Sequence, residues 1–142
     1  MKIADVHAHV FPEKLAVKAA GSIGQFYGAK MYCEASMAEK EKAGVSRYVI
    51  SSSAVVPKQV RSIVEFLAEA RKGHPECISF GSIYPGMDGY EEVLDELQAL
   101  GSRGLKIHPD FQKLPIDDPS GIETYRSIAR RGLPGLVHMG DN

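Results

Sequence analysis

Strand-like and helix-like segments alternate along this chain, and that alternation constrains its fold more than any other feature. Short β-like runs occupy residues 2–9, 47–52, 78–84, 104–108 and 133–138. Helical patterns occupy residues 36–44, 57–73, 88–101 and 118–132. From the second strand onward the alternation is strict, which is typical of βαβ units around a parallel sheet. Right-handed crossovers then leave two architectures, an open doubly wound sheet or a barrel.

Signals for helix ends support these boundaries. Ser36 and Glu39 have the spacing of a capping box, and Asp88 with Glu91 repeats a cap followed by an acid. Pro57 suits the first turn of a helix, and Asp118 precedes a proline that opens the last helix. Glycines stand where the helices should stop, at Gly44, Gly73, Gly101 and Gly132. Residues 11–33 have no clear period, and we expect a loop with one short helix there.

The composition is that of one ordinary globular domain spanning residues 1–142. The net charge is −1 and 44% of the residues are hydrophobic. This balance gives no electrostatic reason to expect a nucleic acid partner. No apolar run reaches the roughly 18–20 residues of a membrane span, and no signal-peptide core follows Met1, so we expect a cytoplasmic protein. Cys33 and Cys77 are predicted to be packing residues.

The first strand carries a histidine pair with metal-ligand spacing. His7 and His9 are two residues apart, so they share one strand face with Cα atoms about 6.6 Å apart. Two imidazoles at this spacing can bind one divalent ion. Asp5, predicted on the same face, could orient an imidazole from behind. The alternative is a strand whose histidines point to solvent.

Two other strands end in histidine at the same predicted edge of the sheet, where active sites of parallel α/β proteins lie. His138 closes the last strand, and convergence with the first pair is expected. Lys106 and His108 share one face of the strand before it. We interpret Lys106 either as a substrate-binding or metal-contacting residue, or as a lysine that extends to solvent at the rim. His74 lies in a loop at the opposite end, where solvent exposure is expected.

The remaining acidic residues give weaker signals. Glu91, Glu92, Asp95 and Glu96 form a charge run that predicts a solvated helix face. Asp110 follows the strand that bears His108 and could face the site. No glycine-rich phosphate loop, nucleophile elbow or CxxC pair is present.

The residues Asp5-Val6-His7-Ala8-His9, Gly104-Leu105-Lys106-Ile107-His108-Pro109 and Leu136-Val137-His138-Met139-Gly140 together resemble the amidohydrolase superfamily. The nearest branch is the amidohydrolase-2 group, with aminocarboxymuconate-semialdehyde decarboxylase-like enzymes. The resemblance implies a (β/α)8 TIM barrel with about five βα units in this chain. It also implies a divalent metal, with zinc favoured by three imidazoles and manganese or iron as alternatives.

By this resemblance, His7, His9 and His138 match the metal ligands of the family. His108 matches a catalytic histidine near metal and substrate, and Lys106 lies near a position that binuclear relatives carboxylate. We also assign Asp110 and Phe11 to substrate binding. The implied reaction is attack of metal-activated water on an amide, lactone or ester carbonyl of a small molecule.

The chain departs from the family in length, because such barrels need roughly 250 residues. The family's later metal-binding aspartate has no counterpart here, so we expect an incomplete barrel, a fragment or a chain that associates with itself. A metal-dependent non-oxidative decarboxylase and a non-catalytic metal-binding module stay open as alternatives. A phosphoesterase barrel ranks lower because its extra carboxylate ligands are not evident.

Overall fold

A computed structural model describes residues 2–16, 18, 32–33 and 37–139 of the chain. The strands are β1 (Ile3–Phe11), β2 (Tyr32–Cys33), β3 (Val45–Ser51), β4 (Cys77–Ser82), β5 (Gly104–Ile107) and β6 (Gly135–Val137). The α-helices are α2 (Met37–Lys42), α3 (Val60–Ala70), α4 (Tyr90–Ala99), α5 (Pro109–Gln112) and α6 (Ile122–Arg130). Two short 3-10 helices, η2 (Pro57–Gln59) and η3 (Pro119–Gly121), precede α3 and α6.

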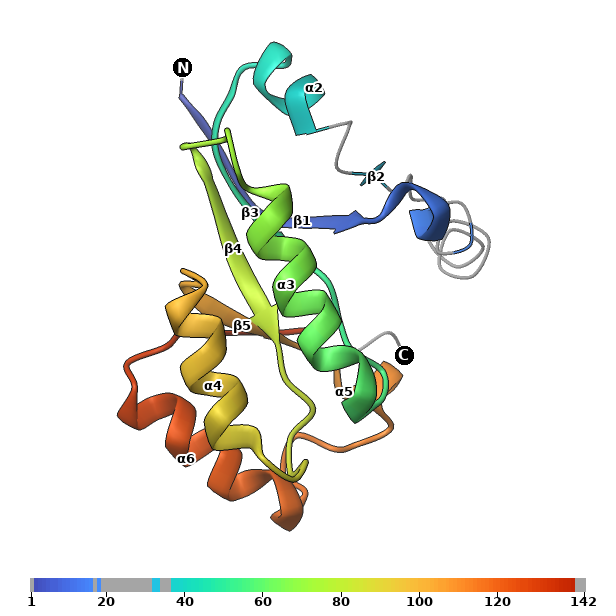
Figure 1. Ribbon diagram of the computed structural model, residues 1–142, viewed down its shortest axis with the longest axis vertical. Coiled ribbons are helices and arrows are strands. Elements are labelled where there is room, and N and C mark those ends of the chain that lie inside the picture. The colour runs from blue at the N-terminus through green and yellow to red at the C-terminus, as the bar shows by residue number, and fades with distance from the viewer. Residues whose placement is uncertain (1, 17, 19–31, 34–36, 140–142) are drawn as a thin grey trace.

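All strand pairs in the described chain are parallel, in the order β2-β1-β3-β4-β5-β6. The sheet curls, and α3, α4 and α6 cover its outer side (Figure 1). This is a half-barrel built from successive βα units, so the prediction of a partial (β/α)8 barrel is confirmed. Because the strands are parallel, their carboxyl ends meet at one edge.

The central strands are buried on both faces, as expected of a parallel sheet. Every residue of β5 is buried, although Lys106 is among them. On β3, Tyr48 and Ile50 point outward into a core with Leu67 of α3, while Ser51 occupies the opposite, concave face. Each strand therefore contributes alternate residues to the helix layer and to the concave face.

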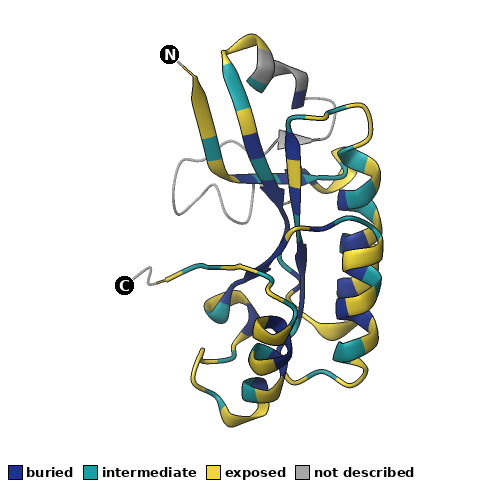
Figure 2. Ribbon diagram, turned by 90° about the vertical axis from the view of Figure 1, so that its left-hand side faces the viewer, coloured by how far each residue is buried: buried dark blue, intermediate teal, exposed yellow. Residues whose placement is uncertain are grey.

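The helices bury the stripes that their periodicity predicts. Val60, Val64 and Leu67 of α3 are buried at helical spacing, and α4 buries Leu94 and Leu97 in the same way. Buried residues line the contact between helices and strands, whereas the outer faces of the helices and much of β1 are exposed (Figure 2). Gly101 and Gly132 follow the ends of α4 and α6 with φ of 83° and 65°, the left-handed region that favours glycine.

Three local features differ from the sequence-based expectation. The described part of the 11–33 segment contains the short strand β2, paired with β1, in place of an unbroken loop. Helix α5 was not predicted, and it begins directly after β5 at Pro109. Asp88 does not cap α4: Gly89 is the N-cap, with φ of 68° and no side-chain cap bond. Ser36 and most of segment 11–33 lie outside the described residues.

Other end signals are confirmed. The carboxylate of Asp118 accepts a hydrogen bond from the Ser120 amide at 2.9 Å, as expected of an N-cap. Pro57 is the first residue of η2. Cys77 is buried in the core against β3 and α3, in agreement with a packing role.

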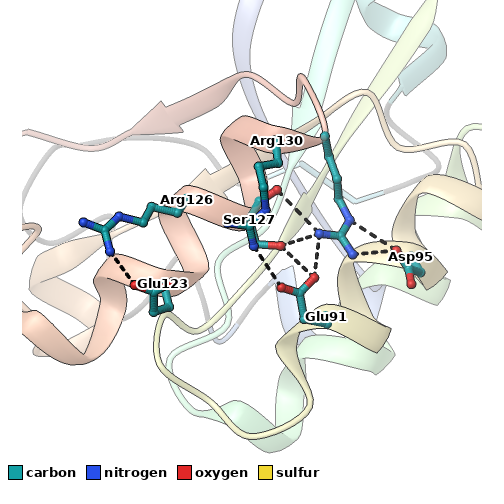
Figure 3. Close-up of polar contacts among 7 residues, drawn as sticks. Glu91, Asp95, Glu123, Arg126, Ser127 and Arg130 are labelled. Atoms are coloured by element: carbon teal, nitrogen blue, oxygen red, sulfur yellow. Dashed lines mark hydrogen bonds and ion pairs between the residues drawn. The ribbon is translucent and has the colours of Figure 1, made fainter.

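The acidic face of α4 is exposed to solvent, as predicted, and two of its carboxylates also bind Arg131, which directly follows α6. Arg131 lies 2.6 Å from a Glu91 oxygen and 2.7 Å from an Asp95 oxygen. Ser127 also donates to Glu91 at 2.7 Å (Figure 3). These contacts tie α4 to α6 on the outside of the sheet, and Glu96 similarly binds Arg61 of α3. The prediction of a solvated face did not include these ion pairs, because it considered one helix without its neighbours.

Within the described ranges, no helix has both the length and the hydropathy needed to cross a membrane.

Candidate functional site

The predicted site residues gather at the carboxyl edge of the sheet. His9 lies near the end of β1, and Lys106 is on β5. His108 and His138 directly follow β5 and β6. These side chains, together with His7, come from positions up to 131 residues apart, yet contacts between neighbouring side chains connect all five.

The two β1 histidines face each other closely. Their Nε2 atoms are 3.0 Å apart, and the Nδ1 atom of His9 lies 3.3 Å from the Ser51 carbonyl oxygen. A carbonyl accepts only, so Nδ1 of His9 carries the proton and its Nε2 presents a lone pair. That tautomer is the one a metal-ligating Nε2 requires, with the carbonyl fixing the ring from behind.

Asp5 does not share the face of these histidines. The pairing of β1 with β3 shifts by one residue between Asp5 and Ala8, so the strict alternation assumed from sequence is interrupted by a bulge. Asp5 therefore pairs opposite the outward-facing Tyr48. Its carboxylate accepts the His7 main-chain N–H at 3.0 Å and the Lys40 ammonium of α2 at 2.5 Å. It holds the backbone at His7, and its charge also acts on the His7 imidazole, where it raises the pKa against the stronger lowering by burial and Lys106.

Lys106 reaches the histidine pair from β5, which is separated from β1 by β3 and β4 in the curled sheet. Its Nζ lies 3.2 Å from Nε2 of His7, and the residue is 0% exposed. The alternative in which Lys106 extends to solvent at the rim is therefore wrong. The described residues offer this lysine no carboxylate partner. A fully buried amine without an anion is costly, which is the usual signature of a ligand-binding group.

Burial and like charge keep the histidines neutral. Burial, followed by the nearby Lys106, lowers the pKa of His9 to about 4. Burial and then Lys106 also lower the pKa of His7, and burial lowers the pKa of Lys106. At neutral pH both β1 imidazoles thus have a nitrogen lone pair to offer to a cation.

His138 lies beside the pair but is turned toward β5. Its ring stacks on His108 with centroids 4.1 Å apart and an interplanar angle of 13°. Phe111 stacks on the ring of His108 at 3.9 Å. The His138 centroid is 6.4 Å from that of His7. The sequence analysis placed His138 at the correct edge of the sheet. Its binding of the same metal ion as His7 and His9 stays a prediction.

Two of the imidazole nitrogens, those of the β1 histidines, are spaced as ligands of one divalent ion would be. Nitrogens that bind one tetrahedral ion at about 2.0–2.1 Å lie ~3.4 Å apart, close to the 3.0 Å between the β1 imidazoles. No three His, Cys, Asp or Glu side chains within the described ranges are already arranged as a metal-binding group. The hydroxyl of Ser51 is buried next to His9 and finds no hydrogen-bond partner in the described chain, which leaves a polar atom for a ligand or water.

The other predicted residues are less closely associated. Phe11 is the last residue of β1, two residues after His9 and so on the same face of the strand, and it is half-buried. Asp110 is exposed in the first turn of α5. His74 lies at the amino end of β4, away from the site as predicted, but it is partly buried, 3.6 Å from Glu76.

Sequence reasoning missed Gln112. This residue is 2% exposed, and its carboxamide binds the main chain at the ends of three strands. The available signal was Pro109, directly after His108, because a proline there can start a helix. In such a helix Gln112, four residues after His108, lies one turn further on. Without the structure, a polar residue in an apparent loop gave no reason for attention.

Comparisons with known proteins place this geometry in a structural context. No protein-family model matches the chain, and no curated protein matches it. An amidohydrolase II crystal structure resembles it with a TM-score of 0.77 and 14% identity, over 99% of this chain and 51% of that one. A 5-carboxyvanillate decarboxylase from Novosphingobium aromaticivorans, with bound manganese and 3-methoxy-4-hydroxy-5-nitrobenzoic acid, has a TM-score of 0.74 and 13% identity, over 96% and 50%.

A Staphylococcus aureus protein assigned as an amidohydrolase has a TM-score of 0.62 and 15% identity, over 100% of this chain and 48% of that one. The chain therefore spans about half the length of the solved structures that resemble it. The fold is that of TIM-barrel amidohydrolases, in agreement with the resemblance seen in the motifs.

Proposed function

We propose that this chain carries the metal-binding part of a metal-dependent hydrolase of the amidohydrolase type. The observation that carries the proposal is the pair of neutral β1 imidazoles, His7 and His9, whose Nε2 atoms lie 3.0 Å apart at the carboxyl edge of a half-barrel. The likeness in fold to amidohydrolases supports it.

In this proposal His7 and His9 hold a divalent ion, and His138 completes the set. Zinc suits three imidazoles, although one similar structure contains manganese. A divalent ion in such a site supplies Lewis acidity toward a carbonyl and a nucleophilic water at neutral pH. The chain's own residues fix the ligand tautomer, through the Ser51 carbonyl, and exclude solvent around Lys106.

Lys106 is proposed to bind an anionic or strongly polarised oxygen of the small-molecule substrate. Its amine is buried, and among the described residues its one hydrogen-bond partner is His7. An oxygen of the substrate would supply the negative charge that the described residues do not. The exposed Asp110 and half-buried Phe11 would contact the same substrate from the rim.

Metal titration tests the first step. We expect zinc to bind wild type with an affinity at least about tenfold higher than it binds His7→Ala, the lower end of the cost of losing a ligand or its support. His74→Ala is the matched control, because it removes a histidine from the opposite end of the sheet. Equal affinities for wild type and His7→Ala would show that the β1 histidines are not ligands.

Catalysis is tested on cyclic amides, lactones and esters with the metal-loaded protein. Hydrolysis that disappears in His7→Ala and persists in His74→Ala supports the proposal. Metal binding without turnover of any of these substrates would refute the hydrolase and leave a decarboxylase or a non-catalytic metal-binding module.

A decarboxylase is the second candidate, and Lys106 is the observation that favours it. A buried lysine without a carboxylate partner in the described chain suits a substrate that itself carries a carboxylate. The similar structure of a 5-carboxyvanillate decarboxylase agrees with this choice. Release of carbon dioxide from an aromatic or muconate-type acid, without hydrolysis of lactones, would decide for it.

A further inference from the structure

One buried side chain connects the carboxyl ends of three strands. The Nε2 atom of Gln112 donates to the Ala54 carbonyl after β3 at 3.1 Å and to the Ile83 carbonyl after β4 at 2.7 Å. Its Oε1 atom accepts the main-chain N–H of His108 after β5 at 3.2 Å. Three of the four hydrogen-bonding positions of the carboxamide are thus used inside the protein.

The main chain of Gln112 adds two further contacts to this arrangement. Its N–H donates to the His108 carbonyl at 2.9 Å, and its carbonyl accepts the Tyr84 hydroxyl at 3.0 Å. Gln112 therefore binds both the main-chain N–H and the main-chain carbonyl of His108. A side chain that is 2% exposed and bonded at the ends of three strands cannot shift without leaving buried carbonyls unpaired.

The same turn determines the tautomer of His108. The Phe111 N–H approaches Nδ1 of His108 at 3.5 Å, and an amide can only donate. Nδ1 is then the acceptor, so the neutral ring carries its proton on Nε2. His9 has the opposite arrangement, because its Nδ1 donates to a carbonyl. The two rings thus differ in what they can do: one presents a lone pair at Nε2 and the other an N–H.

We propose that Gln112 is a positioning residue that holds His108 in the Nε2–H tautomer, so that His108 acts as a hydrogen-bond donor toward a substrate oxygen and not as a metal ligand. The substrate part rests on the proposed function. The tautomer part does not, because it follows from the contacts of His108 with Phe111 and Gln112 of α5. The stacked Phe111 ring keeps the His108 plane fixed while Gln112 fixes its main chain.

Nitrogen NMR of the metal-free protein, labelled with 15N-histidine, tests the assignment directly. Wild type should show His108 protonated at Nε2 and His9 protonated at Nδ1. Addition of zinc should shift the ring nitrogens of His9 and leave the tautomer of His108 unchanged. A wild-type His108 protonated at Nδ1, or one whose Nε2 responds to zinc as a ligand does, would overturn the proposal. If zinc moves neither ring, the proposed metal site fails while the His108 assignment stands on the metal-free spectrum.

Gln112→Met tests the positioning role, since it keeps the length of the side chain and removes all three of its bonds. We expect the His108 tautomer ratio to fall by up to about tenfold, the bias that one hydrogen bond of ordinary net strength provides. Gln112→Glu keeps an acceptor for the His108 N–H but loses both donors, so its ratio should lie between wild type and Gln112→Met.

Leu97→Ala is the matched control for lost stability, because it removes a fully buried side chain of α4 on the outer side of the sheet. It should retain the wild-type tautomer. An unchanged ratio in Gln112→Met, or an equal fall in Leu97→Ala, would contradict a specific positioning role. Should Gln112→Met fail to fold, Gln112→Glu and the wild-type spectrum still decide the question.

Discussion

Replacement of Lys106 by methionine should stabilise this protein while removing the amine that we propose binds the substrate. Methionine has nearly the length of lysine and no charge, so Lys106→Met keeps the packing of β5. The wild-type residue is 0% exposed, and within the part of the chain that the structure describes its amine has one hydrogen-bond partner, His7, at 3.2 Å. A residue kept at a cost to stability is expected where function requires it.

The size of the gain follows from the lysine's own chemistry. A buried amine can always give up its proton, at about 1.36 kcal/mol for each pH unit below its ordinary pKa of 10.5. At pH 7 this sets a ceiling of about 4.8 kcal/mol on the penalty. The bond to His7 offsets about 1.5–3 kcal/mol of it. We therefore expect Lys106→Met to raise the free energy of unfolding by about 1–3 kcal/mol, or Tm by roughly 3–10 °C.

Chemical denaturation of the metal-free protein, with chelator present, measures this gain. Lys58→Met is the matched control at an exposed position and should change stability by less than about 0.5 kcal/mol. Burial lowers the folded-state pKa of Lys106, so the unfolded chain binds more protons. The stability of wild type should then rise from pH 7 toward pH 10.5, and the advantage of Lys106→Met should shrink. A variant less stable than wild type would refute the reasoning, since the amine would then be well satisfied within the fold.

Three further predictions concern the metal, the loops and the outer helices. Zinc should raise the free energy of unfolding of wild type by up to about 2.7 kcal/mol at a hundredfold excess over Kd, and its Tm with it. His9→Ala should show no such rise, and equal shifts in Tm would place the metal elsewhere. Gly86→Ala should cost at least about 2 kcal/mol in denaturant unfolding, because φ is 77° and the new Cβ would meet the Ser120 carbonyl oxygen at 2.7 Å. Gly132→Ala, at φ of 65° with open space around it, should cost about 1–2 kcal/mol; equal losses would show that the clash adds nothing. Arg131→Met should lower Tm and make it less dependent on salt, since this cation joins α4 to α6; an unchanged Tm would show that the contacts contribute nothing.

Local patterns were sufficient for most of the architecture. Hydrophobic period and end signals depend on residues within one or two turns, so α3, α4 and α6 were found where their stripes predicted them. The carboxyl ends of parallel strands lie at one edge of the sheet, however the side chains pack. For that reason His108 and His138 could be placed beside the first histidine pair from sequence alone.

Features that depend on a partner far along the chain could not be predicted. The bulge in β1 arises from its pairing with β3, and it alone moves Asp5 away from the histidine face. The ion cluster on α4 needs an arginine from α6, and the burial of Lys106 needs the whole sheet around it.

The sequence by itself determined which histidines reach the carboxyl edge, because strand order and period are local properties. Only the tertiary structure decided what each one does there, since ring stacking, tautomers and pKa values depend on contacts between strands. His9 and His108 illustrate the difference: both are histidines at strand ends, but a carbonyl faces Nδ1 of one and an amide N–H faces Nδ1 of the other. That choice of neighbour is made by the fold, and it assigns one imidazole as a candidate metal ligand and the other as a hydrogen-bond donor.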